Sequence, residues 1–136
     1  MAATVLSQTA EYALRAVLFI AARGNGAAVR ADEIATVLKI PSSYLSKTLR
    51  VLAKAGVLTS ERGRTGGFRL SEPAGTLMLD RVVAPFMEDA TRRHCLLGGK
   101  TCSDATACAA HHAWKATAEQ IAVFFRTTTL AALQEW

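Results

Sequence analysis

Residues 42–70 read SSYLSKTLRVLAKAGVLTSERGRTGGFRL, a helical pattern followed by a short turn-rich segment. The leucines at positions 45, 49 and 52 recur at the spacing of one helix face. We expect this helix to begin near Ser42, as its N-cap, and to end at Gly56. On a helical wheel of about 100° per residue, the opposite side carries a polar and basic stripe with an aromatic border: Ser43, Lys47, Arg50, Lys54 and Tyr44.

A helix with a leucine inner face and a basic outer face is typical of the second helix of a helix-turn-helix, which enters the major groove of DNA. On its own it also fits an ordinary surface helix with a solvated charged face. The segment that follows favours the first interpretation. Residues 57–62 are rich in strand-forming types, residues 63–67 supply turn chemistry, and Phe68 and Leu70 share one face of a returning strand.

This hairpin carries Arg62 and Arg64 near its tip. A hairpin directly after a recognition helix is the wing of a winged helix, and arginine at its tip suits phosphate or a narrow minor groove. An isolated surface hairpin is the alternative. The order of helix, helix, helix and basic hairpin disfavours it, because each part makes the next more expected.

Two helices are expected before this stretch. Residues 6–22 show the three- and four-residue spacing of an amphipathic helix, and the glycines at 24 and 26 end it. A shorter helix has Asp32 and Glu33 in its first turn, where the helix dipole favours acids, and ends at Pro41. Its predicted inner face consists of Ile34, Val37 and Leu38.

The second half of the chain is predicted to contain a helix over residues 77–87, which Pro85 kinks or splits, and a long helix over residues 105–126. The long helix would span about 30 Å, more than one small domain can cover. We therefore expect a second copy of the chain to cover it in a symmetric homodimer. The predicted dimerisation stripe is Trp114, Ala118, Ile121 and Phe125, with Ala122 beside it.

Charge is distributed unevenly along the 136 residues, whose net charge is +5. Residues 1–71 carry ten Lys and Arg against four acids, or +6, whereas residues 72–136 carry six against seven, or −1. A basic half joined to a neutral half suggests a surface for a polyanion, although a merely soluble basic surface also fits. The 51% hydrophobic content excludes a disordered chain. No apolar run reaches the roughly 18 residues of a membrane span, and no signal peptide is evident, so we expect a cytoplasmic protein without a membrane partner.

All three cysteines fall within residues 95–111, CLLGGKTCSDATACAAH: Cys95, Cys102 and Cys108, with His111 one helical turn later. Buried structural cysteines are disfavoured because the stretch is polar and glycine-rich. A zinc site, a metal-free thiol switch and an iron-sulfur cluster with one ligand other than cysteine remain. The spacing alone does not rank these three.

Two other classes are excluded by the sequence. Gly99-Lys100-Thr101 resembles the end of a nucleotide-binding phosphate loop, but His94 stands where that motif requires glycine. No nucleotide site is therefore expected. No serine or acid is spaced to form a recognisable triad with the histidines, so we do not expect an enzyme.

Several motifs together resemble a known family. They are residues 11–16 (EYALRA), Tyr44-Leu45, residues 54–56 (KAG), Arg62-Gly63 with residues 66–68 (GGF), the three cysteines, and residues 129–133 (TLAAL). In this order they are similar to the bacterial winged-helix repressors that include IscR, NsrR and RirA. The resemblance implies a homodimeric transcription factor whose affinity for double-stranded DNA depends on an iron-sulfur cluster held by the three cysteines.

The fourth cluster ligand differs within that family. His111 matches the histidine that completes a 2Fe-2S site in IscR-like members, and Glu11 matches the acid that the partner subunit contributes to a 4Fe-4S site in NsrR-like members. This sequence has both, and we favour His111 because imidazole is the softer ligand. Ser46 departs from the IscR-like pattern, which has an acid there that helps to choose the base sequence, so the operator sequence stays open.

The expected fold is therefore mainly α, with a winged helix-turn-helix and two-stranded wing over residues 1–73, then a cluster-binding loop and a long dimerisation helix over residues 74–136. We expect a roughly palindromic operator read by two recognition helices. A small iron-sulfur electron carrier or scaffold that does not bind DNA is the rival class. Affinity is assigned to Lys47, Arg50, Arg62 and Arg64, and base contacts to Ser43, Tyr44 and Ser46.

Overall fold

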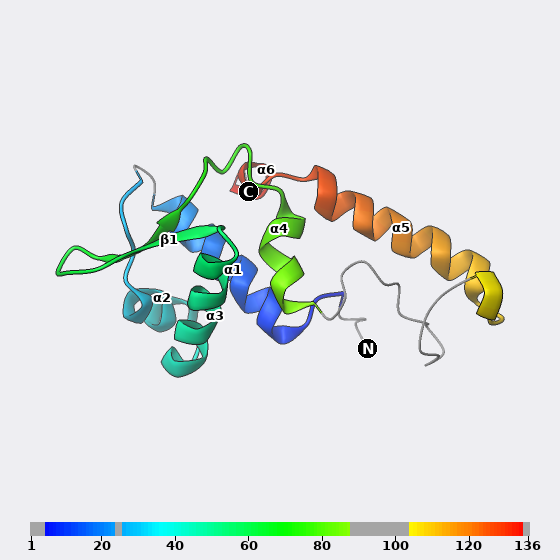
Figure 1. Ribbon diagram of the computed structural model, residues 1–136, viewed down its shortest axis with the longest axis horizontal. Coiled ribbons are helices and arrows are strands. Elements are labelled where there is room, and N and C mark those ends of the chain that lie inside the picture. The colour runs from blue at the N-terminus through cyan, green and yellow to red at the C-terminus, as the bar shows by residue number, and fades with distance from the viewer. Residues whose placement is uncertain (1–4, 24–25, 88–103, 135–136) are drawn as a thin grey trace.

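Helices account for most of the computed structural model, which describes residues 5–23, 26–87 and 104–134 (Figure 1). A two-stranded antiparallel sheet is the only sheet among those residues. The predicted fold class, a mainly helical winged helix-turn-helix with a two-stranded wing, is confirmed. The elements in order are α1 (Gln8–Ala22), α2 (Ala31–Leu38), α3 (Ser42–Lys54), β1 (Leu58–Glu61), β2 (Gly67–Leu70), α4 (Leu79–Val83), the 3-10 helices η1 (Ala84–Phe86) and η2 (Asp104–Thr106), α5 (His111–Thr127) and α6 (Leu130–Gln134).

Helix α2 ends earlier than the sequence suggested, so the turn between α2 and α3 is longer than expected. Lys39 ends α2 by adopting a left-handed conformation with φ of 57°, before Pro41 is reached. The expectation that Ser42 caps α3 is wrong, since Pro41 occupies the cap position and makes no side-chain cap hydrogen bond. Its carbonyl accepts a hydrogen bond from the amide of Leu45 at 2.9 Å, which starts the helix at once.

The core forms where α1, α2 and α3 meet. The three leucines of the predicted inner face of α3 are completely buried, against the alanine-rich side of α1. In α2, Ile34 and Ala35 are buried and Leu38 is partly buried, whereas Val37 is 54% exposed. The inclusion of Val37 in the inner face was therefore wrong. It lies about 110° around the helix from the centre of the buried side.

The wing is held to the rest of the chain by backbone hydrogen bonds. Strands β1 and β2 pair with Leu58 opposite Leu70 and Glu61 opposite Gly67. The N–H and C=O groups of Val29 and Phe68 exchange two hydrogen bonds of 2.8 Å, which anchor β2 beside the segment before α2. Gly67 has φ of 147°, and a Cβ there would lie 2.3 Å from the carbonyl oxygen of Val29, so this position requires glycine.

The segments after the wing return to the same core. Helix α4 gives way to the 3-10 helix η1 at Pro85, as predicted. Leu77, Leu79, Val82 and, from α6, Leu130 are buried in the core that α1 and α3 also line. Residues on both sides of the predicted boundary at 73 thus share one core. That residues 1–73 bind DNA and residues 74–136 hold the cluster and form the dimer stays a prediction.

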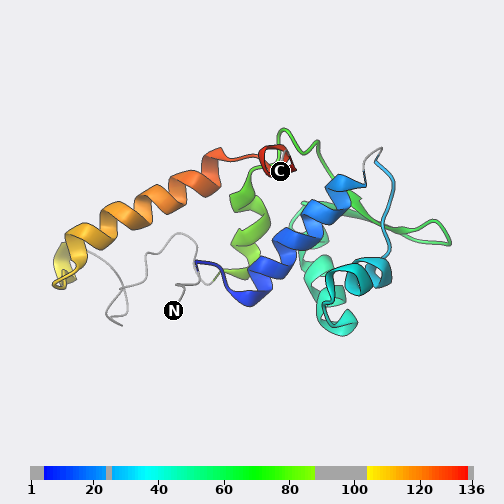
Figure 2. The same cartoon turned by 180° about the vertical axis from the view of Figure 1, so that it is seen from behind.

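Helix α5 begins at His111 rather than at residue 105. The residues before it form η2 and a turn in which the amide of His111 donates to the carbonyl of Cys108 at 3.0 Å. Figures 1 and 2 show α5 extending away from the other helices, joined to them at its C-terminal end near α4 and α6. We call residues 104–127 the arm, and residues 5–23, 26–87 and 128–134 the head. Neither the head nor the arm contains a helix with the length and hydropathy that crossing a membrane requires.

Candidate functional site

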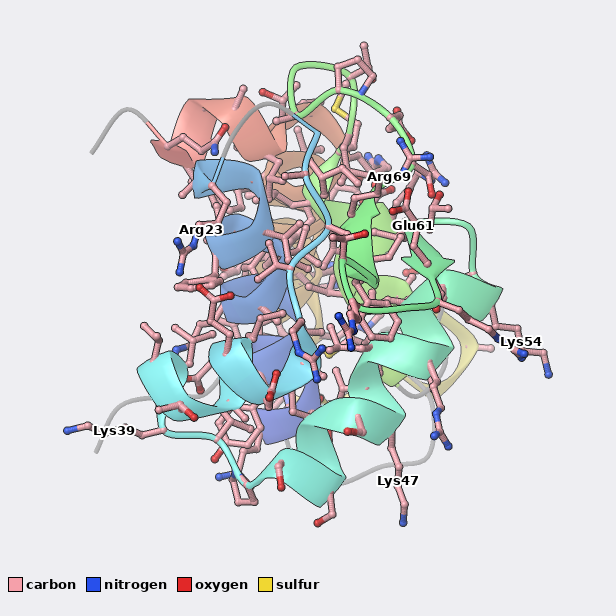
Figure 3. All side chains as sticks on the ribbon, turned by 90° about the vertical axis from the view of Figure 1, so that its left-hand side faces the viewer. Arg23, Lys39, Lys47, Lys54, Glu61 and Arg69 are labelled. Carbon is pink, nitrogen blue, oxygen red and sulfur yellow. The ribbon has the colours of Figure 1, made fainter. Side chains whose placement is uncertain are left out.

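The outer face of α3 presents the predicted polar and basic stripe. Ser43, Lys47, Arg50 and Lys54 are all exposed, while the leucines on the other side are buried. Figure 3 shows Lys47 and Lys54 projecting from α3 away from the core, with Lys39 pointing to the other side of the molecule. The amphipathic pattern of α3 therefore leaves its basic face free for a partner.

The wing tip lies beside the start of this helix. Arg62 and Arg64 are exposed in the loop between β1 and β2. An open groove of about 390 Å³ separates the wing from the first turns of α2 and α3, and Ser46 is one of the residues that line it. The predicted contact residues of α3 and the wing are thus brought to neighbouring surfaces. A nucleic acid backbone that followed α3 would meet the wing on leaving it.

The cations of these two elements differ from most others in the chain. Within the described residues, those of α3 and the wing tip make no ion pair and donate no side-chain hydrogen bond: Lys47, Arg50, Lys54, Arg62 and Arg64. By contrast, six others are paired with carboxylates: Arg23, Arg30, Arg69, Arg81, Lys115 and Arg126. Positive charge that no local acid balances is therefore concentrated on α3 and the wing, as a polyanion site requires.

Tyr44 is placed differently from its neighbours on α3. Its hydroxyl forms a hydrogen bond with that of Thr9 on α1, and its ring meets the ring of Tyr12 edge-on at 5.6 Å between centroids. Gln8 in turn donates to the Tyr12 hydroxyl at 3.1 Å. The sequence pattern assigned Tyr44 to base edges, and it held no signal for this contact because α1 and α3 meet only through the tertiary fold. Tyr44 is 38% exposed, so its predicted contact with bases stays open.

Two of the five predicted metal ligands can be placed at the start of the arm. Cys108 is half-buried in the turn before α5, and His111 is the first residue of α5, with only 1% of its surface exposed. Cys95 and Cys102 lie outside the described residues. The hydrogen bond between the backbone groups of Cys108 and His111 sets thiol and imidazole one turn apart.

Asp104 joins this group, although the sequence analysis treated it only as part of a polar loop. Its Oδ1 lies 2.7 Å from Nε2 of His111, and Nζ of Lys115 lies 3.2 Å from Oδ1 and 3.4 Å from Oδ2. The hydrogen bond with His111, and after it that from Lys115, holds the pKa of the Asp104 carboxyl below its usual range. The sequence held little sign of this contact. Asp104 precedes His111 by seven residues, and a helix was expected to begin at residue 105 and separate them.

Glu11 lies elsewhere in the molecule. It is an exposed residue in the first turn of α1. The start of α1 and the start of α5, where His111 lies, are well separated along the long axis in Figures 1 and 2. Within one chain the structure therefore does not bring Glu11 together with Cys108 and His111. A shared site would need Glu11 from a second copy.

The described donors fit an iron-sulfur cluster by their chemistry. Thiolate and imidazole are the ligand types that such clusters use. A histidine that binds a metal commonly forms a hydrogen bond to a carboxylate through its other ring nitrogen, and Oδ1 of Asp104 lies 2.7 Å from Nε2 of His111. The same arrangement also suits zinc.

The predicted dimerisation stripe on α5 is half-buried within the single chain. This holds for Trp114, Ala118, Ile121, Ala122 and Phe125 alike. Phe125 also packs against the core of the head. The large apolar side chains that the arm exposes most are Val123, at 40%, and Phe124, at 48%. These two lie outside the predicted stripe.

Comparisons with known proteins agree with this geometry. The profile of the Rrf2 family, described as iron-dependent transcriptional regulator, matches residues 6–135. The transcriptional regulator IscR of Vibrio atlanticus is 32% identical over 132 residues, which cover 96% of this chain and 75% of that protein. Among solved structures, CymR, the global cysteine regulator of B. subtilis, has a TM-score of 0.82 at 18% identity and covers 98% of both chains. IscR of T. potens has a TM-score of 0.76 at 20% identity, covering 97% of this chain and 87% of that one. At such identities the structures show a common fold.

Proposed function

The chain belongs to the Rrf2 family of winged-helix transcriptional regulators, and from this premise we propose that it is a homodimeric repressor whose operator affinity depends on an iron-sulfur cluster. The proposed ligands are Cys95, Cys102, Cys108 and His111, with Glu11 of a second copy as the competing fourth ligand. The signal would be nitric oxide, redox state, or the supply of iron or clusters. The protein is expected to act in the cytoplasm on a roughly palindromic double-stranded operator.

One observation carries the DNA-binding part of the proposal. The cations on α3 and at the wing tip have no acidic partner among the described residues, whereas most of the other described cations do. Unpaired lysine and arginine release counterions when they meet phosphates, which gives affinity and a steep salt dependence. In a two-fold dimer the two α3 helices would enter major grooves about one turn, or 34 Å, apart.

The cluster part of the proposal rests on the start of the arm. Cys108 and the buried His111 lie in one turn, and both are ligand types for iron-sulfur chemistry. When bound, a cluster supplies a centre that reacts with nitric oxide and oxidants and that can be gained or lost with iron supply. Cys108 and His111 would then hold the start of α5 in one position only while the centre is present.

The route from the arm to DNA follows contacts within the chain. The carbonyl of Thr128, just after α5, accepts from the amide of Leu79 at 3.0 Å, and the amide of Leu130 donates to the carbonyl of Leu77 at 2.8 Å. Helix α4 packs against α1, and α1 packs against α3. A change in the position of α5 would therefore reach the recognition helix through packed helices. A coupling of roughly 1 to 3 kcal/mol, or five- to 150-fold in affinity, is typical of such switches.

The test compares cluster-loaded and apo protein on one operator. The protein is purified without oxygen, its iron, sulfide and zinc are measured, and its operator is selected from a random duplex library. We expect visible absorption with iron and sulfide, and at least a fivefold difference in operator affinity between the two forms at matched salt. Cys108→Ala should abolish both, whereas Ala109→Ser, on the neighbouring exposed residue, should change neither.

Other outcomes would identify the rival functions. A colourless protein with stoichiometric zinc would support a zinc-dependent regulator, and a metal-free protein whose affinity follows thiol oxidation would support a thiol switch. A coloured protein that selects no duplex would point to an electron carrier or cluster scaffold. Equal operator affinity of the loaded and apo forms would overturn the proposed regulation.

A further inference from the structure

The groove between the wing and the first turns of α2 and α3 differs in charge from the surfaces on either side of it. The cations of α3 and of the wing tip have no acidic partner among the described residues. The groove is instead lined by two carboxylates, Asp32 and Glu61, and one cation, Arg30. Carboxylates repel the phosphates that the flanking cations attract. A duplex held by those cations would therefore meet the groove with its base edges rather than with its backbone.

The fold itself accounts for Asp32. Its Oδ1 accepts a hydrogen bond from the amide of Glu33 at 3.0 Å and lies 3.3 Å from Nε of Arg30. An acid in the first turn of a helix is also stabilised by the helix dipole. These contacts belong to the start of α2, so the groove needs no ligand to explain them.

Glu61 is fixed on the wing and remains accessible. It is the last residue of β1 and pairs with Gly67, whose backbone lies against Val29. Its Oε1 lies 2.6 Å from Nε of Arg69 on β2, and Figure 3 shows these two residues next to each other on the wing. Arg69 is its only partner among the described residues, and 41% of the Glu61 side chain is exposed. The strand and the ion pair therefore hold a carboxylate that can accept further hydrogen bonds.

The chemistry of DNA limits what this carboxylate can contact. An ionised carboxylate only accepts hydrogen bonds, and in the major groove the donors are the amino groups of cytosine and adenine. Adenine presents its amino group beside the acceptor N7, which opposes a carboxylate, so acidic side chains pair with the N4 amino group of cytosine. Ser46 of α3 lines the same groove as Glu61. A base contacted by Glu61 would therefore lie next to those that α3 is predicted to contact.

We propose that Glu61 selects part of the operator sequence by accepting a hydrogen bond from the amino group of a cytosine in the major groove, and that Arg69 is a positioning residue that holds the carboxylate. This inference rests on the DNA-binding part of the proposed function and extends it from affinity to one base pair. Guanine and thymine present acceptor oxygens in the major groove, and these would oppose the carboxylate. The wing thus has two roles, since the cations near its tip supply affinity and Glu61 rejects wrong bases.

The first experiment compares two losses of charge in the same groove. Protein purified without oxygen selects its operator from a random duplex library, as wild type, Glu61→Ala, Glu61→Gln and Asp32→Asn. We expect wild type to prefer cytosine at one position of each half-site by about 5- to 150-fold, and both Glu61 variants to lose this preference. Asp32→Asn is the matched control, because it removes the same charge from the same groove. It should keep the preference and change the affinity for every duplex alike.

The second experiment removes the amino group from the DNA. In one duplex the selected cytosine is replaced by 2-pyrimidinone, which lacks the amino group, and in another its guanine partner is replaced by hypoxanthine, which lacks the amino group of the minor groove. Wild type should lose about 5- to 150-fold in affinity for the first duplex only, and Glu61→Ala should bind it as well as the unmodified operator. Arg69→Ala should show an intermediate loss, because its carboxylate is present but no longer held. Fluorescence anisotropy at matched salt measures each affinity, and circular dichroism verifies that each variant folds.

The outcomes separate this inference from the proposed function. A wild-type protein that selects no duplex overturns both. A cytosine preference that survives in Glu61→Ala, or an operator without such a preference, overturns the inference alone. Equal gains of Glu61→Ala and Asp32→Asn on every duplex, with unchanged base preferences, would show that Glu61 acts only through its charge and would also overturn it. A loss of wild-type affinity for the hypoxanthine duplex alone would place the contact in the minor groove and overturn the assignment to cytosine.

Discussion

The head and the arm are both helical, but they bury their side chains differently. In α3 of the head, four of the thirteen residues are buried, three of them leucines, whereas in the seventeen-residue α5 the one buried residue is His111. The head therefore encloses a core of its own. The arm has apolar side chains that are half-buried at best, and its one buried side chain is a candidate ligand.

This difference indicates how stability and regulation are divided. A segment that packs into a core is specified by its own contacts, whereas a segment with little buried surface depends on what binds it. We infer that the head would keep its structure whether or not a cluster is present. The arm would take its final position only with its ligand and a second copy. Five predictions test this comparison, from the largest expected effect to the smallest.

Leu49→Ala in α3 should cause the largest loss of stability. Leu49 is completely buried in the core of the head, and such truncations cost about 2 to 5 kcal/mol in the free energy of unfolding. Ile121→Ala in the arm is the matched variant, since Ile121 is only half-buried. Denaturant unfolding of apo protein followed by circular dichroism measures both. Equal losses in the two variants would contradict the division of stability between head and arm.

Gly67→Ala should be the next most damaging change. A Cβ at Gly67 would lie 2.3 Å from the Val29 carbonyl oxygen, so the backbone pairing between Val29 and β2 must shift. We expect a loss of about 2 to 3 kcal/mol. Gly63→Ala is the control, because Gly63 also has a positive φ, of 105°, but a Cβ there meets nothing within 4 Å. In thermal unfolding, the melting temperature of Gly67→Ala should lie below that of Gly63→Ala. The reverse order would show that the anchoring of the wing contributes little to stability.

The sequence was sufficient for most of the head because its signals are local. Leucine spacing, the glycine at position 56 and the turn residues of the wing each predicted an element that the structure contains. The errors arose where a local pattern competed with packing: Val37 fits an apolar spacing but faces solvent, and α5 starts six residues later than expected. In the candidate site, the basic stripe was predictable from helical periodicity. The contacts of Tyr44 with α1 and of Asp104 with His111 were not, because they depend on how separate elements meet.

Phe124→Asp should weaken self-association through the arm. Phe124 is 48% exposed in the single chain, and a charged side chain there would be desolvated in an interface. We expect the dimer dissociation constant to rise at least tenfold, or about 1.4 kcal/mol. Ser60→Asp on β1 adds the same charge to an exposed position of the head and should have no effect. Sedimentation velocity over a concentration series measures the dimer dissociation constant of each variant. Unchanged association would show that the arm meets its partner through a different face.

Lys47→Ala and Arg64→Ala should weaken binding to every duplex by a similar factor. Each removes one cation that has no acidic partner among the described residues, so the slope of log affinity against log salt should fall by about one unit per substitution. Arg69→Ala is the control on the wing, because Arg69 is paired with Glu61 at 2.6 Å. Fluorescence anisotropy of a labelled duplex at several salt concentrations measures the slope for each variant. A slope that falls as much in Arg69→Ala would show that local pairing does not decide which cations meet DNA.

Tyr44→Phe should produce the smallest effect on stability and tests the link between α1 and the recognition helix. It removes the hydroxyl that bonds to Thr9 and keeps the ring that meets Tyr12, so the free energy of unfolding should fall by about 0.5 to 1.5 kcal/mol. Tyr12→Phe is the control, since it removes a hydroxyl bonded within α1 to Gln8. If the Thr9 contact passes changes in α1 to α3, Tyr44→Phe should reduce the affinity difference between loaded and apo protein, with little change in sequence preference. A loss of sequence preference at one operator position would instead support the predicted contact between Tyr44 and a base. A direct contact affects one base pair, whereas a change in the position of α3 affects every base pair that the helix meets.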